Sequence, residues 1–432
     1  MKKTFLIILL MIPLLSLQAQ TVERDTIRMT LEDCLEYAFG YNYQRQSVKI
    51  NEEAQEDIYE QTKMERWPSL SASLSESLSH TQGTKSSYDG NYGLNTSVTL
   101  YEGGKIGNTI KKEELGLKKA GYESLQYDNE LTIQILQTFL TALGNEELLR
   151  LQAYLVTVSE EQEREGKLKY ESGQMIESDY LLLKAQLATN KKDMLQSEIN
   201  RDNSLMSLKS LLSMDPLLKF AIIPPNDNID SLRFILPELE FMERAMNTLP
   251  DLKISEYLVE MAEVGIKISK SGYYSTLALN AGIGTGHSRN YEHFGDQLSD
   301  RFNQQVGVSL SIPIFDKKRT KSNVNQSKFS LQQAQFSQKQ TELDLRQTLA
   351  QEYRNVIAAE STYDASDIKR NAYYESFNAY NVMFREGAIT TVDLLQQQNN
   401  YISAMNEYIQ DKYNFILKRK IVDVYLGEPI TM

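Results

Sequence analysis

Histidine and cysteine supply most catalytic bases, nucleophiles and transition-metal ligands in proteins, and this chain contains few of either. Its 432 residues include three histidines, His80, His287 and His293, and a single cysteine, Cys34. One cysteine cannot form a disulfide framework or a multi-cysteine metal cage within the chain. A metalloenzyme and a triad hydrolase are therefore disfavoured.

The remaining candidates for chemistry are weak. The three histidines fall in or beside loops between predicted strands, where we expect exposed polar side chains, although His287 and His293 with Glu292 could hold a metal ion loosely. Gly282–Gly286 has the glycine content of a phosphate-binding loop, but it leads from one predicted strand to another rather than into a helix. We therefore expect no enzyme activity, no cofactor and no dedicated metal site.

The chain is acidic, with 58 Asp and Glu against 46 Lys and Arg and a net charge of −12. Because it has no concentrated basic block, it is a poor match for nucleic acid. Hydrophobic residues make up 41% of the chain, so it can bury a core. Length alone would suggest about three domains.

The first 19 residues have the layout of a secretory signal peptide. A positive start, Lys2 and Lys3, precedes an apolar run from Phe5 to Leu17, and the small residue Ala19 stands at the expected cleavage point. A transmembrane anchor is the alternative, but about 13 apolar residues are fewer than the roughly 20 that a spanning helix needs. No later segment is an apolar 20-mer, so any membrane crossing must use β-strands.

The elements that must position any functional residue are very long helices. No proline lies between Ser69 and Asp215 or between Ile314 and Glu428, and the stretch from Lys317 to Glu386 lacks glycine as well. A helix of that length measures roughly 100 Å, which a globular core cannot bury. Apolar residues recur at mixed three- and four-residue spacings, which is typical of coiled-coil packing. We predict long helices over residues 104–170 and 317–385.

Each long helix ends at a glycine, and a return helix follows. Gly173 and Asp179 in the first half correspond to Gly387 and Asp393 in the second at a constant offset of 214, and upstream segments correspond at an offset of 207. The chain is therefore predicted to be an internal duplication. The first repeat covers residues 20–215, with a return helix at 176–213. A connector covers 216–236, and the second repeat covers 237–432, with a return helix at 390–426.

Each repeat also contains two predicted strands, in which apolar residues alternate with serine and other polar residues. The expected strands are residues 67–79, 91–101, 274–286 and 302–315. Their length and alternation are typical of outer-membrane strands, and serine at the inward positions favours a water-filled lumen over an ordinary half-buried sheet. Four strands in lipid would leave open edges, so the chain must oligomerise.

Aromatic residues precede the first strand of each repeat. Trp67 and the pair Tyr273 and Tyr274 occupy positions where an interfacial aromatic girdle is expected, although Trp67 could equally anchor a core.

The ordered set of motifs resembles the outer-membrane efflux protein family (TolC-like) over essentially the whole mature chain. It combines the twofold repeat, the strand pairs that enter long helices at residues 100–104 and 314–316, and the two Gly-to-Asp hairpins. The resemblance implies a mainly α fold with a β-barrel part, in which three chains form a 12-stranded outer-membrane barrel continued by a periplasmic α-helical barrel. It further implies a passive exit duct of a tripartite efflux or type I secretion system. The implied partners are two further copies, a periplasmic adaptor, an inner-membrane transporter and outer-membrane lipid.

The resemblance also assigns roles to individual residues. The hairpin tips that would contact the adaptor comprise Gly173, Gln174, Met175, Gly387, Ala388 and Ile389. Asp393 matches an acidic position that lines the closed periplasmic entrance in relatives, while Gln396 replaces the second acidic residue of that gate. Asp179 could share in the gate or cap the helix that begins near Ser178, and capping is favoured. Ile389 stands where some relatives carry a basic residue that ties the closed state.

An exported coiled-coil tether or adhesin without a pore is the alternative that the pattern leaves open. Within the duct interpretation, the sequence does not separate drug, metal and protein cargo.

Overall fold

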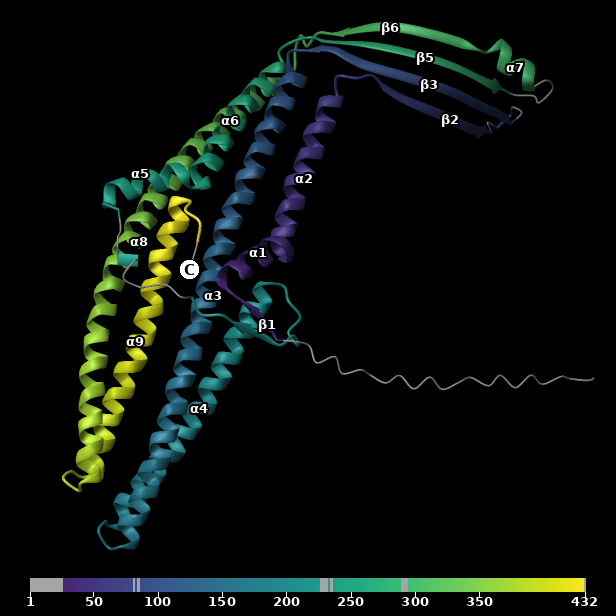
Figure 1. Cartoon of the computed structure of the whole chain (residues 1–432). Coiled ribbons are helices and arrows are strands. Elements are labelled where there is room, and N and C mark those ends of the chain that lie inside the picture. The colour runs from purple at the N-terminus through teal and green to yellow at the C-terminus, as the bar shows by residue number, and fades with distance from the viewer. Residues whose placement is uncertain are drawn as a thin grey trace, which may run out of the picture.

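The computed structural model describes residues 26–80, 82–83, 86–225, 232–233, 236–288 and 294–430 (Figure 1). The predicted signal peptide lies outside these residues. The helices are α1 (Leu31–Tyr41), α2 (Tyr43–Met64), α3 (Lys105–Glu171), α4 (Glu177–Leu211), α5 (Glu238–Thr248), α6 (Pro250–Ser271), α7 (Phe294–Asp300), α8 (Arg319–Arg385) and α9 (Thr391–Leu426). The strands are β1 (Ile27–Met29), β2 (Ser69–Ser79), β3 (Ser87–Glu102), β4 (Phe220–Ile222), β5 (Thr276–Ser288) and β6 (Asn303–Ser311).

The element bounds reproduce the duplication. Helices α1 and α2 correspond to α5 and α6 at an offset of 207 at both ends of each helix. Helices α3 and α8 are each 67 residues long and correspond at an offset of 214. The prediction of two structural repeats, each a strand pair with very long helices, is therefore confirmed.

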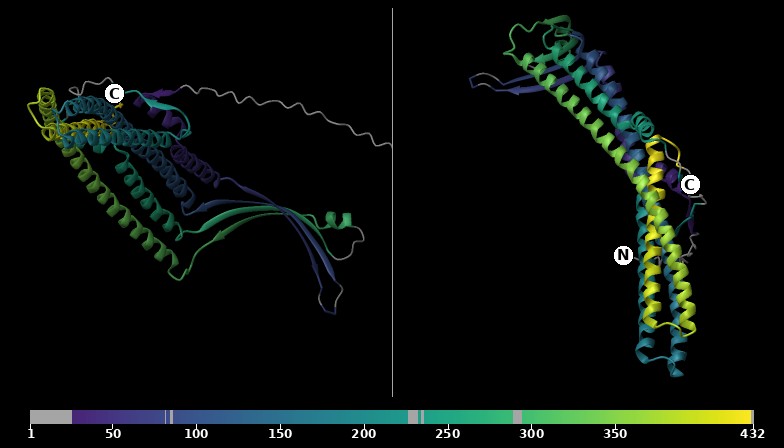
Figure 2. Two further views of the ribbon diagram at one scale, coloured as in Figure 1. Left: turned by 90° about the horizontal axis from the view of Figure 1, so that it is seen from below. Right: turned by 90° about the vertical axis from the view of Figure 1, so that its left-hand side faces the viewer.

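The chain is elongated, with the sheet at one end and two helical hairpins at the other (Figures 1 and 2). Helices α3 and α4 form one hairpin and α8 and α9 form the second, and α2 and α6 pack along the upper parts of α3 and α8. The main core lies at mid-height, where residues of α1, α5 and the connector pack on the long helices. The expectation of about three globular domains is wrong, because neither repeat buries its apolar residues without the other.

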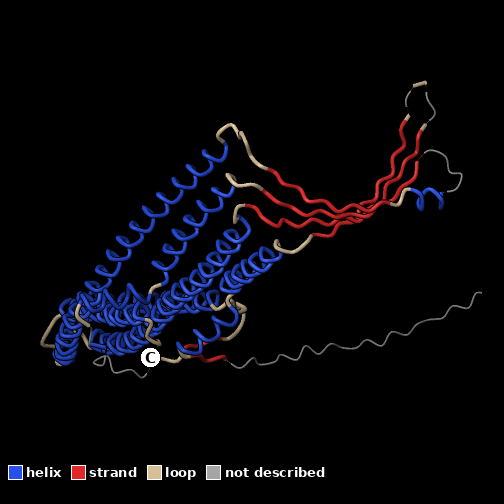
Figure 3. The backbone as a smooth tube through the Cα atoms, turned by 90° about the horizontal axis from the view of Figure 1, so that it is seen from above, coloured by secondary structure: helices blue, strands red, loops and turns tan. Residues whose placement is uncertain are grey.

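Four strands form one antiparallel sheet in the order β2-β3-β5-β6, so the two repeats meet at the β3–β5 pair (Figure 3). Strands β2 and β6 lie at its edges, and every residue in both is exposed. The observed β3 begins four residues earlier than expected, and β6 ends at Ser311 rather than at 315.

A second, two-stranded sheet was not predicted from the sequence. The three-residue strands β1 and β4 pair in parallel, with Ile27 opposite Phe220, and tie the start of the described chain to the connector. Three residues are too few to show a periodic pattern.

The strand-to-helix junctions use the same backbone in both repeats but different residues. Gly103 and Gly104 precede α3 with φ of 59° and 78°, and Lys317 and Lys318 precede α8 with φ of 55° and 66°. Glycine adopts this left-handed conformation freely, whereas a side chain costs roughly 1 kcal/mol or more per residue. The second junction is therefore the strained one.

Within the described part of the chain, none of the helices has an apolar stretch of membrane-spanning length.

Candidate functional site

The two hairpin tips are the same structure built from different residues. Gly173 and Gly387 adopt left-handed φ angles of 76° and 75° directly after the long helices. The amide after each glycine donates to a carbonyl five residues earlier at 2.8 Å, Gln174 to Lys169 and Ala388 to Met383. This is a Schellman helix stop, in which a side chain on the glycine would be strained.

The six predicted tip residues form three equivalent pairs that border solvent in similar ways in both loops. Gln174 and Ala388 are exposed next to the glycines, whereas Met175 and Ile389 are half-buried against the apolar cluster between the hairpins. Each tip therefore exposes a glycine and the residue after it, with a half-buried apolar residue behind them.

The return helices begin differently, and the structure reverses the expected capping roles. Asp393 forms a capping box with Thr390: its backbone N–H donates to the Thr390 hydroxyl at 3.2 Å, and its carboxylate accepts from the Thr390 N–H at 3.2 Å. The N-cap of α4 is Ile176, which has no side-chain oxygen, and α4 begins at Glu177, close to the predicted start. Asp179 lies in the first turn of α4, where a negative charge favours the helix dipole.

The two predicted gate residues of α9 lie on one exposed face. Asp393 and Gln396 are three residues apart and both exposed, and Gln396 donates to Asn400 at 3.2 Å on the next turn. One oxygen of the Asp393 carboxylate accepts the capping hydrogen bond, but the side chain stays exposed. The charge therefore remains available to solvent.

A lysine that the sequence analysis did not single out joins the two hairpins near their tips. Nζ of Lys169 on α3 donates to the carbonyl oxygens of Phe384 and Arg385 at 2.8 and 3.0 Å, at the end of α8. The same ammonium lies 4.8 Å from the centre of the Phe384 ring and 3.3 Å from the Glu165 carboxylate. The Arg385 guanidinium lies 3.9 Å from the Glu161 and Glu165 carboxylates.

Polar side chains continue this seam inside the helical bundle. The Ser159 hydroxyl of α3 accepts from Asn190 of α4 at 2.5 Å and from Gln398 of α9 at 3.4 Å, and all three residues are buried. Gln162 donates to Asn381 across the same seam at 3.2 Å. The hairpins are thus held together partly by buried hydrogen bonds between side chains.

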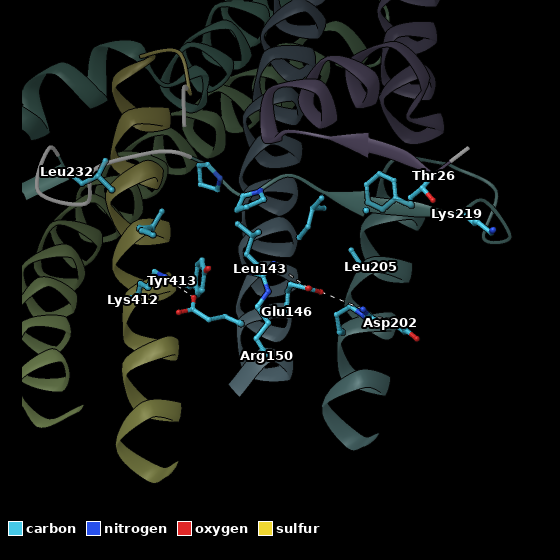
Figure 4. Close-up of a pocket in the computed structure, with 18 residues that line it drawn as sticks. Thr26, Leu143, Glu146, Arg150, Asp202, Leu205, Lys219, Leu232, Lys412 and Tyr413 are labelled. Carbon is cyan, nitrogen blue, oxygen red and sulfur yellow. Dashed lines mark hydrogen bonds and ion pairs between the residues drawn. The ribbon is translucent and has the colours of Figure 1, made fainter. Parts of the chain in front are cut away.

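A cavity of about 920 Å³ lies between α3, α4, α9 and β4 (Figure 4). Charged side chains line it, but they pair with one another: Glu147 contacts Lys412 at 2.8 Å, and Glu146 lies 3.7 Å from Arg201. The lining contains four cations and three carboxylates, and the described part of the chain contains no cluster of metal-ligating residues there.

The sheet has one mainly apolar face, which also carries Glu76 and His287, and one polar face. Register places Leu74 of β2, Leu94 of β3, Ile283 of β5 and Val308 of β6 on the same side. The opposite side carries Ser, Asn, Gln, Thr, Gly and Ala, and its charged strand residues are Asp89 at the end farthest from the helices and Glu102 at the helix end. Such a sheet can separate lipid from water.

The three aromatic residues predicted for the girdle are exposed at the helix end of the sheet. Trp67 is 70% exposed, and Tyr273 and Tyr274 are 55% and 57% exposed. Trp67 is therefore not a core anchor.

The expectation of exposed histidines is wrong for His287. This side chain is 5% exposed, because Phe294 of α7 and Tyr88 of β3 pack on its ring. Its Nε2 lies 3.2 Å from the Glu76 carboxylate of β2, and the two side chains meet above Gly90 of β3.

The other predicted chemical features give no site. His80 is exposed and contacts Ser86, and His293 and Glu292 lie outside the described residues. Gly282–Gly286 is part of strand β5. Among the residues that the structure describes, no group of three or more potential metal ligands occurs.

Comparison with known proteins agrees with this geometry. Residues 242–428, most of the second repeat, match the model of the family described as outer membrane efflux protein. The outer membrane protein TolC of Escherichia coli is 22% identical over 72% of this chain and 64% of its own length. The outer membrane efflux protein BepC of Brucella suis is 20% identical over 90% of this chain and 83% of its own. The chain thus spans less than two thirds of TolC.

A solved structure of an outer membrane channel, MtrE of Neisseria gonorrhoeae, superimposes with a TM-score of 0.76 at 17% identity and covers 92% of this chain and 89% of that one. The fold is therefore that of the TolC-like channels. The resemblance noted from the sequence is confirmed: the second repeat matches the model of the outer membrane efflux protein family, and TolC and BepC are similar to most of the chain.

Proposed function

We propose that three copies of this chain form an outer-membrane channel, the exit duct of a tripartite efflux or type I secretion system. The observation that carries the proposal is the four-stranded sheet with one apolar and one polar face and two exposed edge strands, mounted on helices roughly 100 Å long. Four strands cannot close in lipid, whereas three copies supply 12. The relatives named as outer membrane efflux proteins support this function.

Opening at the periplasmic end requires no covalent chemistry. The hairpins can occupy a closed and an open arrangement, and a partner that contacts the open one better shifts the population. We assign adaptor contact to the tips around Gly173 and Gly387, and the gate to Asp393 with Gln396 and Asp179. Asp393 combines exposure with charge, so three symmetry-related copies would favour cations at the constriction.

The remaining parts of the proposal concern surroundings and partners. The apolar sheet face and its girdle, Trp67, Tyr273 and Tyr274, would contact outer-membrane lipid. An inner-membrane transporter would supply cargo through the adaptor, and neither enzyme activity nor nucleic-acid binding belongs to this role.

Purification of the full-length chain tests the proposal. We expect a detergent-extracted trimer that shifts on gels after heating and forms ion-conducting pores in planar bilayers. The alternative, a tether or adhesin without a pore, predicts extraction without detergent and no conductance, and that result would reject the channel.

A further inference from the structure

The junction between β6 and α8 presents an exposed group of apolar and cationic residues that the channel function does not use. Ile314 and Phe315 are 94% and 81% exposed. Lys317, Lys318 and Arg319 follow after Asp316 and are also exposed. Within the described ranges, none of these three cations has an ion-pair partner at 4.0 Å or less.

The equivalent junction of the first repeat lacks this group. Glycines occupy the two positions that correspond to Lys317 and Lys318, and the cation that follows, Lys105, is paired with Glu102 at 2.6 Å. The repeats share this backbone, so the fold does not require the lysines. They add positive charge at a place where glycine would be less strained.

The nearby carboxylate does not neutralise the group. Asp316 accepts from the backbone N–H of Thr320 at 2.8 Å and is directed toward the start of α8. Thr320 is buried against Gly272 at the end of α6, so the junction is fixed to the helical region while its cations remain in solvent.

The position of the group relates it to the apolar face of the sheet. Val306, Val308 and Leu310 are exposed on that face of β6, and the chain continues from them through Ile314 and Phe315 to the cations. An apolar stripe that ends in aromatic and cationic residues matches a lipid leaflet from hydrocarbon to head group. Because the helices leave the sheet at this end, the leaflet is the periplasmic one.

We propose that residues 312–319 bind anionic phospholipid, with Ile314 and Phe315 in the acyl region and Lys317, Lys318 and Arg319 at the phosphate groups. The chemistry favours a lipid with net negative charge over a zwitterionic lipid, because three unpaired cations face one carboxylate that is already hydrogen-bonded. This inference rests on the proposed function, since only a membrane-inserted sheet places the junction at a leaflet.

Glycine substitution provides a sharp test. In Lys317→Gly/Lys318→Gly, each new residue is the one that the first repeat carries, so the variant should fold at least as well as the wild type. Native mass spectrometry of the detergent-purified trimer would count bound phosphatidylglycerol and phosphatidylethanolamine with matched acyl chains. We expect the wild type to prefer phosphatidylglycerol at low salt, and the variant to bind it about tenfold or more weakly.

Two further variants separate the effect of the lysine charges from the effects of backbone strain and of position along the chain. Lys317→Gln/Lys318→Gln should lose the same preference for phosphatidylglycerol, while residues with side chains still occupy the two left-handed backbone positions. Lys328→Gln/Lys339→Gln removes two exposed lysines farther along α8 and should leave the preference unchanged.

Three results would overturn the inference: no preference for phosphatidylglycerol in the wild type, an unchanged preference in the glycine variant, or an equal loss in the α8 control. Conductance measured on the same samples distinguishes the two proposals. A conducting trimer without lipid preference rejects only the lipid site, whereas the absence of a conducting trimer rejects both.

Discussion

The ammonium of Lys169 donates to the carbonyl oxygen of Phe384 at 2.8 Å. A side chain of the first hairpin therefore hydrogen-bonds a backbone carbonyl at the C-terminal end of the long helix in the second. The relationship is not reciprocal, because the repeat equivalent of Lys169 is Met383. One residue therefore supplies a directional tie between two otherwise similar hairpins.

Removing this tie should favour separation of the hairpins. Lys169→Met loses two charge-assisted hydrogen bonds, each worth about 1.5–3 kcal/mol in general, so we expect at least about a tenfold shift toward the open state. Single-channel recording in planar bilayers would show a larger mean conductance. Lys167→Met, an exposed neighbour, is the matched control, and equal conductance in the two variants would contradict the role of Lys169.

Two substitutions at Asp393 should separate its cap from its charge. Asp393→Asn keeps an oxygen that can accept from the Thr390 N–H, whereas Asp393→Ala removes it and should cost about 1 kcal/mol at the start of α9. Both remove the charge, so reversal potentials should show the same loss of cation selectivity. Unchanged selectivity in both variants would place the ion-selective step elsewhere.

Gly90 should be needed for the outer part of the sheet. A Cβ at this position would collide with Nε2 of His287 and with the Glu76 carboxylate. Gly90→Ala should therefore destabilise the sheet by about 1–3 kcal/mol and lower the temperature at which the trimer loses its compact gel mobility. Gly307→Ala, on a strand of the same sheet with no atom near its Cβ, should cost less.

Cys34 should be unreactive in the folded protein. The side chain is fully buried in the main core, and burial raises the pKa of its thiol to about 12. At pH 8 iodoacetamide should label it roughly a thousandfold more slowly than in urea, because the thiolate is the reactive form. Comparable labelling rates in the folded and denatured protein would show that α1 opens freely.

The same pKa shift makes the free energy of unfolding depend on pH in the alkaline range. A thiol whose pKa is higher in the folded state makes its full contribution to the free energy of unfolding below the pKa of the unfolded chain, near 8.5. That contribution declines as pH rises toward about 12. Cys34→Ala should flatten this part of the pH dependence in urea unfolding.

The long elements were predictable because their signals are local and repeated. Absence of proline and glycine defines α8, and Gly173 and Gly387 mark where the long helices stop. The fold class followed from the ordered set of these features.

The capping assignment failed although a signal for it was present. Thr390 and Asp393 have the spacing of a capping box, whereas the equivalent of Thr390 in the first repeat is Ile176. Comparing residues before the helix start, rather than the acidic residues alone, would have given the observed roles.

No local sequence pattern predicts the burial of His287 or the hydrogen bonds of Lys169, because both depend on contacts between distant segments. His287 meets Glu76 only because β3 lies between their strands in one particular register, and Lys169 reaches a helix about 215 residues later. Such contacts between distant segments become visible only when the three-dimensional arrangement is known.

The β3–β5 pair that joins the repeats also imposes an order on biogenesis. Asp89 and Ser288 are partners in this pair although 199 residues separate them. During vectorial delivery of the chain, β3 must wait for the whole first hairpin, the connector and α6 before its second neighbour arrives. Until then β2 and β3 form an isolated hairpin, which is marginally stable in water at best. This interval is the time at which a periplasmic chaperone would have most to protect.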